Sequence, residues 1–295
     1  MPLVSVIIPN YNHASFLKQR IDSVLNQTFV DFEIIILDDC STDNSREVIE
    51  TYRENRKIKT IVYNEANSGS PFKQWKKGID LAEGEYVWIA ESDDWAYPRF
   101  LEKLIAAIAQ FENVGICFSG SNWIDDNGKT GKDLSLYHKD FFRTGREEIK
   151  NSLIKFNTIQ NASAALMQTA LAQKYIAKTV RYKSSGDWSL YLNILQESNI
   201  LFVNEKLNHF RWYHNNVSKK ASLNGRWIIE GLKILAASGG CLHFSKKEVS
   251  GISHEWLRKP DHFSSFRFLY LKGASYYYVF LFIIKCRFYN FISSK

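Results

Sequence analysis

A run of strand-forming residues that ends abruptly in carboxylates constrains this chain more than any other feature. Residues 85–90 are mostly aromatic, β-branched or small, and Glu91, Asp93 and Asp94 follow them closely. An ionised carboxylate cannot enter a core without a partner, because desolvating an unpaired charge is very costly. We therefore place these side chains at the rim of a sheet, where open α/β folds bind ligands and where clustered oxygens suit Mg²⁺ or Mn²⁺. The alternative is a solvated loop in which Asp94 caps the next helix.

The pattern around this run predicts an α/β fold. Strand-like segments alternate with helical spacing through the first half of the chain, with strands expected at 3–8, 33–38, 58–63, 85–90 and 114–118. This alternation specifies a mostly parallel central sheet flanked by helices on both faces. The loops that follow the strands then meet at one edge. After residue 118 the expected order becomes mixed α+β, with a strand expected at 200–203.

Composition limits the cellular setting. The chain has 295 residues and is 45% hydrophobic, enough for one large domain or for a domain with an appendage. Its four cysteines are scattered and form no Cys-x-x-Cys pair, which argues against a disulfide framework or a zinc knuckle and fits a cytoplasmic protein. The first ten residues lack a basic region and are expected to form the first strand rather than a signal peptide. We expect no nucleic-acid partner.

Four of the expected strand-end loops carry residues suited to a nucleoside diphosphate. They are Pro9-Asn10-Tyr11-Asn12, Asp38-Asp39-Cys40-Ser41-Thr42-Asp43, Asn67-Ser68-Gly69 and Glu91-Ser92-Asp93-Asp94. Together with Ser23-Val24-Leu25-Asn26-Gln27-Thr28-Phe29, these motifs closely resemble the family 2 glycosyltransferases, which have the nucleotide-sugar-binding fold called GT-A. The resemblance is strong over 1–125 and returns in shorter motifs over 180–220. It implies a GT-A catalytic domain over 1–220 and a helical, aromatic and basic extension over 221–295.

The resemblance assigns the donor side of the site. Pro9 and Tyr11 match the loop that lines the base and ribose, and Asp39 matches the acceptor of a hydrogen bond from the base, usually uracil N3–H. Glu91 matches the carboxylate that approaches the ribose, and Asp93 matches the residue that binds Mn²⁺ or Mg²⁺ on the diphosphate. The alternative for Asp39 is a turn or capping role at the start of the following helix.

Two positions depart from the family pattern. Glu91 stands where relatives have Asp, and Trp75 stands where many relatives have Arg in an Ala-Arg-Asn-x-Gly motif. Lys73 or Lys76 could replace that positive charge, although solvated lysines on a helix are the favoured interpretation.

The acceptor side rests on shorter motifs. Asp187, in Ser185-Gly186-Asp187-Trp188, matches the family's catalytic base at the start of a helix. Helix N-terminal amides favour the ionised form, so we expect a carboxylate near neutral pH; the alternative is a plain helix cap. Arg211 and His214 match the late Arg-x-x-His-x-x-x-Ser segment, in which the histidine completes the metal site of some members. A surface-loop histidine is the alternative for His214.

The expected function is an inverting, metal-dependent glycosyltransferase. It would move a sugar from a nucleotide diphospho-sugar, usually UDP-linked in the family, to a glycan or lipid-linked acceptor in bacterial surface polysaccharide synthesis. One alternative is an inactive nucleotide-sugar or glycan-binding module. A nucleotidyltransferase is the other, but it would be expected to carry a Gly-rich, basic phosphate loop, whereas residues 9–16 contain no Gly, Lys or Arg.

The tail over 258–295 is both aromatic and cationic. It holds seven Lys or Arg residues and one acid, so most of the net charge of +7 lies there. Its longest apolar run, 276–284, is too short for a spanning helix, which needs about 20 residues. We expect this tail to lie on the inner face of an anionic membrane, which would make the protein peripheral. The alternative is ordinary helix packing on the domain through Phe266, Leu269, Tyr270, Tyr277, Leu281 and Ile284.

Overall fold

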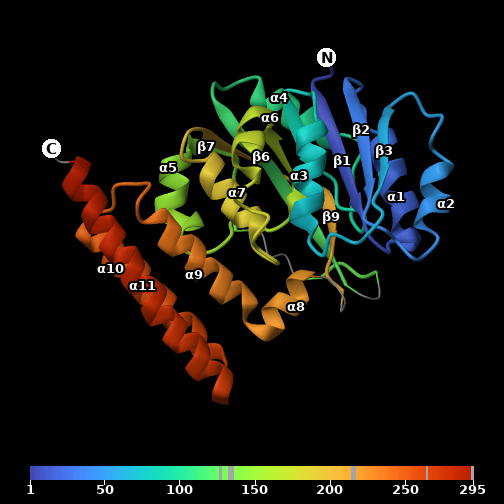
Figure 1. Cartoon of the computed structure of the whole chain (residues 1–295). Helices are drawn as coiled ribbons and strands as arrows, with labels where there is room; N and C mark the ends of the chain where they lie inside the picture. Colours follow the sequence, from blue (N-terminus) through green and yellow to red (C-terminus); the bar gives the residue numbers. More distant parts are fainter. Residues whose placement is uncertain (126–127, 132–135, 214–216, 264, 294–295) are drawn as a thin grey trace.

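Four parallel strands form the first half of the central sheet. The computed structural model describes residues 1–125, 128–131, 136–213, 217–263 and 265–293, and within them the sheet has nine strands. Its first four are β1 (Val4–Asn10), β2 (Phe32–Asp38), β3 (Ile58–Tyr63) and β4 (Tyr86–Ile89), in the spatial order β3-β2-β1-β4. Asn10 lies opposite Asp38, and Ile7 lies opposite Ile89. The carboxyl ends of these strands therefore meet at one edge (Figure 1).

Helices cover both faces of this parallel half because the strand side chains alternate between them. Val6 and Ile8 of β1 point into the core that contains α1 (Ala14–Leu25), whereas Ile7 points into the core that contains α3 (Pro71–Leu81). Both β1 and β2 are buried along their whole length. This is the burial expected of parallel strands. The short helix α2 (Ser45–Glu50) joins β2 to β3.

The second half of the sheet is mixed in direction. Strand β8 pairs antiparallel with β4 and β6, β6 pairs parallel with β9, and β9 pairs antiparallel with β5 and β7. The elements are β5 (Trp95–Ala96), α4 (Phe100–Ile108), β6 (Val114–Ile124), β7 (Phe141–Thr144), α5 (Gly145–Glu148), a π-helical turn (Ile149–Leu153), a 3₁₀ turn (Ala162–Ala164), β8 (Ala165–Gln168), α6 (Thr169–Ile176), α7 (Gly186–Ile194) and β9 (Asn199–Arg211).

The predicted α/β fold is confirmed, and the parallel order holds through β4. The main difference lies in β9, which runs for thirteen residues where the sequence predicted a strand only at 200–203. Its outer part returns beside the carboxylate loop, because Trp95 pairs with His209. The neutral ring of His209 stacks on Trp95 with the centroids 4.3 Å apart, and burial lowers its pKa to about 4. His209 is therefore a packing residue.

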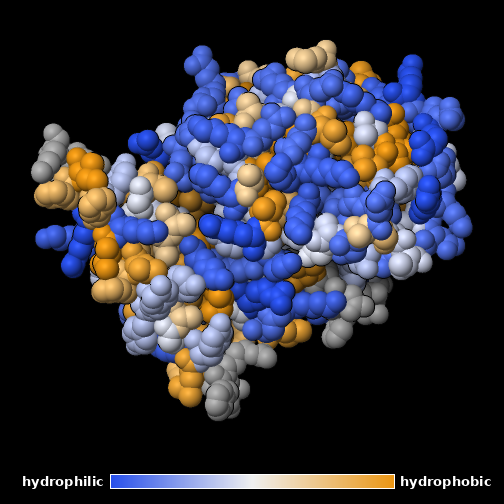
Figure 2. Space-filling view, viewed as in Figure 1, coloured by the Kyte–Doolittle hydropathy of each residue, from blue (hydrophilic) through white to orange (hydrophobic). Residues whose placement is uncertain are grey.

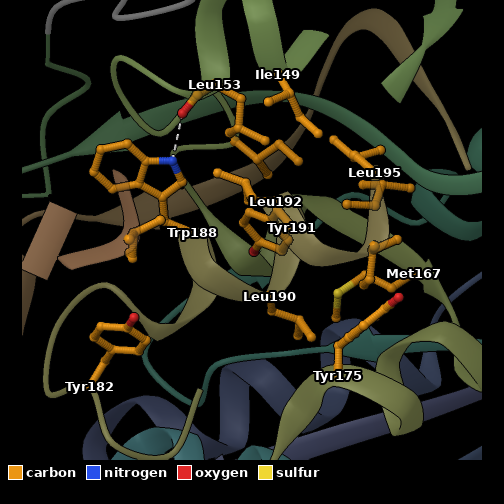
Figure 3. Packing of buried hydrophobic residues seen from close by; sticks show 14 of the residues in the cluster. Ile149, Leu153, Met167, Tyr175, Tyr182, Trp188, Leu190, Tyr191, Leu192 and Leu195 are labelled. Carbon is orange, nitrogen blue, oxygen red and sulfur yellow. Dashed lines mark hydrogen bonds between the residues drawn. The ribbon is translucent and has the colours of Figure 1, made fainter. Parts of the chain in front are cut away.

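The C-terminal helices share a core with the sheet. They are α8 (Val217–Asn224), α9 (Arg226–Ser238), α10 (Lys246–Arg258) and α11 (Ser265–Ser293). Trp188 of α7 stacks on Trp256 of α10 with centroids 5.7 Å apart, and both belong to the cluster that contains Ile7. Figure 3 shows Trp188 and its hydrogen bond to the Leu153 carbonyl within this core. The helical extension is present, while the division at residue 220 stays a prediction.

Helix α11 buries one face and exposes another. Leu271, Val279, Phe282 and Cys286 are buried. Large apolar side chains on its other face are 45–67% exposed: Leu269, Tyr270, Tyr276, Tyr277, Phe280, Ile284, Phe288, Phe291 and Ile292. Figure 2 shows apolar surface over this end of the molecule.

The exposed face of α11 can be compared with the alternative that the tail packs on the domain as an ordinary helix. Leu269, Tyr270, Tyr277 and Ile284, which that interpretation would bury, face outward. Leu281 is partly buried, and the side chain of Phe266 lies outside the described part. Among the described residues, no helix is long and apolar enough to cross a membrane.

Candidate active site

Asp39 is held by a dense set of hydrogen bonds at the end of β2. Its Oδ1 accepts from Asn64 Nδ2 at 2.7 Å, the Ser68 amide at 2.9 Å and Gln74 Nε2 at 2.8 Å. Its Oδ2 accepts from Ser68 Oγ at 2.7 Å. The carboxylate does not cap α2, whose N-cap is Asn44. The Ser41 amide instead donates to Asp38 Oδ2 at 3.1 Å. The capping interpretation of Asp39 is therefore wrong, and its Oδ2 has capacity for one more donor.

The loop after β1 borders the same edge. Pro9 is buried within the strand, whereas Tyr11 just beyond it is 45% exposed. Asn12 joins this loop to the one after β2, because its Oδ1 accepts from the Thr42 amide at 2.7 Å and its own amide donates to Ser41 Oγ at 2.9 Å. Asn12 has a left-handed backbone with φ of 56°, which asparagine tolerates better than most residues. The two loops thus form one connected rim.

The carboxylate loop after β4 is crowded with negative charge. Burial, together with the charge of Asp93, raises the pKa of Glu91 from 4.5 to about 8. The same two causes raise the pKa of Asp94 well above its usual range. Asp94 caps no helix, because its Oδ1 accepts the Arg211 amide at 3.0 Å and α4 begins after Arg99. The interpretation of this loop as a solvated helix cap is therefore wrong.

Glu91 and Trp75 form a direct pair. Trp75 Nε1 donates to Glu91 Oε1 at 2.7 Å, and the Trp75 side chain is otherwise buried against Phe72. The two departures from the family pattern therefore lie in contact. Lys73 Nζ donates to the Ser68 carbonyl at 3.0 Å, and Lys76 pairs with Asp80 on the exposed side of α3.

Two arginines offset part of the charge beneath and beside this loop. Arg20 of α1 is completely buried, and its Nε donates to the Glu91 carbonyl at 2.8 Å. Burial lowers its pKa to about 10 in spite of the nearby carboxylates. Arg211 lies across the loop, donates to the Asp93 carbonyl and to Gln19, and packs over the Trp95 ring at 4.3 Å.

His13 ties the start of α1 to both the carboxylate loop and the end of β9. Its Nδ1 lies 2.8 Å from Ser92 Oγ, and its Nε2 lies 3.0 Å from the Tyr213 hydroxyl. Burial and the charge of Asp93 raise the pKa of Tyr213, so this hydroxyl stays protonated. His214, predicted as a metal ligand, lies outside the described residues. No group of three or more His, Cys, Asp or Glu side chains in the described part is arranged to hold a metal ion.

Asp187 lies in the first turn of α7, and its environment corrects one prediction. Its Oδ2 accepts from Asn157 Nδ2 at 2.8 Å, and the N-cap position belongs to Ser185. Burial raises the pKa of Asp187 from 3.8 to about 7, although backbone amides at the helix start oppose the rise. A helix N-terminus is worth about 1 kcal/mol, less than one pKa unit, so burial wins. The expectation of a fully ionised carboxylate at neutral pH is therefore wrong.

Tyr191 of α7 is a buried polar side chain that was not found from the sequence. Its side chain is fully buried, and its hydroxyl has no hydrogen-bond partner among the described residues. Burial and the charges of Asp187 and Glu91 raise the pKa of this hydroxyl. Its place in α7 is shown in Figure 3. In the sequence, a tyrosine one turn after Asp187 in a predicted helix suggests only a core residue.

Comparison with known proteins identifies the family to which this chain belongs. The sequence profile named Glycosyl transferase family 2 matches residues 5–176. The chain belongs to this family. Its relatives include TuaG of Bacillus subtilis, named for teichuronic acid biosynthesis, which is 29% identical over 255 residues, covering 84% of this chain and 96% of TuaG. An uncharacterized glycosyltransferase of Methanocaldococcus jannaschii is 31% identical over 190 residues, or 63% of each chain.

Solved structures share the fold. TarS 1–349 of Staphylococcus aureus in complex with UDP-GlcNAc has a TM-score of 0.70 at 21% identity, covering 88% of this chain and 73% of that one. The mannosyltransferase PcManGT of Pyrobaculum calidifontis, in complex with GDP-Man and Mn²⁺, has a TM-score of 0.59 at 12% identity, covering 97% and 87%. Because both identities are low, these likenesses establish the GT-A architecture.

Proposed function

We propose that this family 2 glycosyltransferase moves a sugar from a UDP-linked donor to an acceptor hydroxyl with inversion, in surface polysaccharide synthesis. The observation that carries the proposal is that β1, β2 and β4 run parallel and bring Asp39 and Glu91 to one edge of the sheet, in a chain that the family 2 profile matches over residues 5–176. A site with donor-binding carboxylates and a separate base suits direct displacement better than binding alone. TuaG and TarS support the surface-glycan context and TarS supports the UDP-sugar donor.

The donor would lie along the connected rim. Asp39 would accept the base N3–H on Oδ2, which accepts from Ser68 Oγ among the described residues. Exposed Tyr11, two residues after Pro9, would line the base and ribose with it. Glu91 would accept from a ribose hydroxyl through Oε2, because its Oε1 already accepts from Trp75 Nε1.

Asp93 is the candidate ligand for a divalent cation, although no three His, Cys, Asp or Glu side chains in the described part are arranged as a metal site. A carboxylate beside two others whose pKa values are raised by burial and mutual charge is an oxygen-rich site in need of positive charge. Asp93 would hold the ion, with His214 as a candidate second ligand. The Mn²⁺ in the PcManGT structure supports this assignment. Such an ion would offset the charge of the departing diphosphate as a Lewis acid.

Asp187 would act as the general base. With a pKa near 7, it is partly ionised at neutral pH and well matched to taking a proton from an acceptor hydroxyl. The acceptor oxygen forms a bond to C1 as the bond from C1 to the diphosphate oxygen breaks. The proton moves to Asp187, and the nucleoside diphosphate leaves from the opposite face. One displacement of this kind inverts the anomeric centre.

A donor screen tests this function. Purified protein with Mn²⁺, a panel of nucleotide diphospho-sugars and glycan or lipid-linked acceptors should yield a product by mass spectrometry, with the opposite anomer by NMR. Asp93→Ala should lose far more than tenfold in activity, since tenfold is only about 1.4 kcal/mol of barrier. Asp80→Ala, an exposed carboxylate paired with Lys76, is the matched control. Calorimetric binding without turnover would indicate an inactive module, and a retained anomer would refute displacement.

We further propose that the exposed face of α11 rests on an anionic membrane surface near a lipid-linked acceptor. This face carries nine large apolar side chains, and Lys285 and Arg287 are exposed on the same helix. Aromatic residues favour the headgroup boundary, and each cation near anionic lipid adds about 1 kcal/mol. Helix α11 packs on α9 and α10, away from β1–β3 (Figure 1). The cytoplasmic location stays a prediction.

Vesicle flotation tests the membrane surface. The full chain should float with phosphatidylglycerol vesicles at low salt. The double variant Phe280→Ser/Phe288→Ser, at positions 60% and 65% exposed, should lose about 3 kcal/mol of partitioning, roughly a hundredfold. Val30→Ser, a 70% exposed apolar residue elsewhere, is the control. Failure of the full chain to float, or a dimer in solution that the double variant dissociates, would refute membrane docking.

A further inference from the structure

A carboxylate from the C-terminal extension accepts hydrogen bonds from the segment that leads into α7. Glu230 of α9 is 6% exposed and accepts four hydrogen bonds. Its Oε1 accepts from the Lys183 amide at 2.8 Å, and its Oε2 accepts from the Ser184 amide at 2.9 Å, Ser184 Oγ at 2.9 Å and the Ser185 amide at 2.8 Å. Three consecutive backbone N–H groups therefore point at one buried carboxylate.

This contact lies directly before Asp187. Ser185 is the N-cap of α7, but its own side chain makes no capping bond. Glu230 instead binds the amides of Lys183, Ser184 and Ser185, which lead into the helix and precede the amides that a local cap would satisfy. Asp187 comes two residues after Ser185, so the backbone that Glu230 fixes also sets where the Asp187 carboxyl points.

Side chains pack closely around the contact between Glu230 and residues 183–185. A Cβ at Gly231, next to Glu230, would lie 2.4 Å from the Trp256 ring and 2.7 Å from the Trp188 ring. A Cβ at Gly186, the first residue of α7, would lie 2.6 Å from the Phe72 ring. The first turn of α7 is thus pressed between α3, α9 and α10. Its indole anchor, Trp188, donates to the Leu153 carbonyl at 2.7 Å (Figure 3).

We propose that Glu230 is a positioning residue for glycosyl transfer: by binding the amides of residues 183–185, it holds the start of α7 so that Asp187 meets the acceptor hydroxyl. The inference rests on the proposed role of Asp187 as base. It makes α9 part of the structure that places Asp187.

The proposal carries an electrostatic signature. The groups that act on the Asp187 carboxyl are Glu230 from α9, Asn157, the amides at the start of α7 and the Tyr191 hydroxyl. Of these, the charge of Glu230 contributes to the raised pKa of Asp187. Removing that charge should lower the pKa of Asp187, and the acid limb of the kcat profile should move to lower pH. Loss of the charge alone moves this limb, whereas loss of positioning lowers kcat on its plateau, so Glu230→Asp, which keeps the charge, separates the two effects.

Two variants and one control test the inference on the full chain. Glu230→Gln keeps the shape but places an NH₂ group against backbone N–H donors, whereas Glu230→Asp keeps the charge with one methylene less. Glu255→Gln removes a partly exposed carboxylate of α10 that pairs with Lys259. Each variant is first compared with the parent by thermal unfolding, and the amide hydrogen exchange of residues 183–185 is then measured.

The expected result is specific to the base. Glu230→Gln should lower kcat at least tenfold, leave the donor KM within twofold, shift the acid limb to lower pH and speed exchange at residues 183–185. Glu230→Asp should keep the limb near its parental pH and recover part of kcat, while Glu255→Gln should match the parent. The positioning role is wrong if Glu230→Gln retains kcat within twofold of the parent and leaves the acid limb of the kcat profile unmoved. It is also wrong if Glu230→Asp retains kcat within twofold while amide exchange at residues 183–185 becomes fast. Failure of the base itself is recognised separately, because Asp187→Asn would then retain kcat.

Discussion

Replacing Asp187 by asparagine should make the protein more stable and far less active. The side chain keeps its size, and its oxygen can still accept from Asn157 Nδ2. The pKa of Asp187 is raised from 3.8 to about 7, chiefly by burial, so the ionised form is disfavoured in the fold. The stabilisation from the protonated group is complete below pH 3.8 and is lost as the pH rises through 7. A shift of three units corresponds to about 4 kcal/mol.

The stability of the two proteins should therefore diverge with pH. Between pH 4.5 and pH 8 the advantage of Asp187→Asn should grow by about 3 kcal/mol in urea unfolding. Over the same range the variant should lose kcat at least a hundredfold, about 2.7 kcal/mol of barrier, while its donor affinity changes little. Asp80→Asn, on the exposed side of α3, should show neither effect because its carboxylate is solvated.

Two results would refute this reasoning. A stability difference that is the same at pH 4.5 and pH 8 would mean that the Asp187 carboxyl is well solvated. A kcat within tenfold of the parent, or a collapse of donor affinity with kcat retained, would mean that Asp187 is not the base and that its burial serves packing.

Three further predictions concern the donor side. Asp39→Asn should weaken UDP binding about 10- to 100-fold by calorimetry, because an NH₂ group would face the donors now bonded to Asp39, and an unchanged Kd would exclude this residue from the base pocket. Arg20→Met should destabilise the fold by about 3 kcal/mol in urea unfolding, since it leaves buried carboxylates uncompensated; a loss below 1 kcal/mol would contradict this. Glu91→Asp and Trp75→Phe should each raise the donor KM several-fold, and the double variant should show no added loss if the two act as a pair.

The parallel half of the sheet, with Asp39 and Glu91 at one edge, was predictable because it depends on local patterns. Buried runs followed by polar loops located β1, β2 and β4, and parallel order alone brings Asp39 and Glu91 to one edge. The outer part of β9 was not predictable, because Asn204–Arg211 is polar and alternates weakly. Its strand form depends on pairing with β6 and β5. The roles of Tyr191 and Glu230 depend on contacts between distant segments, which no spacing in the sequence records.

The two departures from the family pattern, Trp75 and Glu91, compensate each other because they form a hydrogen bond. Relatives that place Arg and Asp at these positions would have a cation and a short carboxylate there. In this chain an indole N–H reaches a longer carboxylate at 2.7 Å, so the hydrogen bond is kept while a positive charge is lost. The remaining positive charge near the carboxylate loop comes from Arg20, which is buried, and Arg211, which lies across it. Charge balance on a bound diphosphate would then depend more heavily on a cation held by Asp93. Restoring an arginine at position 75 should accordingly weaken the dependence of activity on divalent metal concentration.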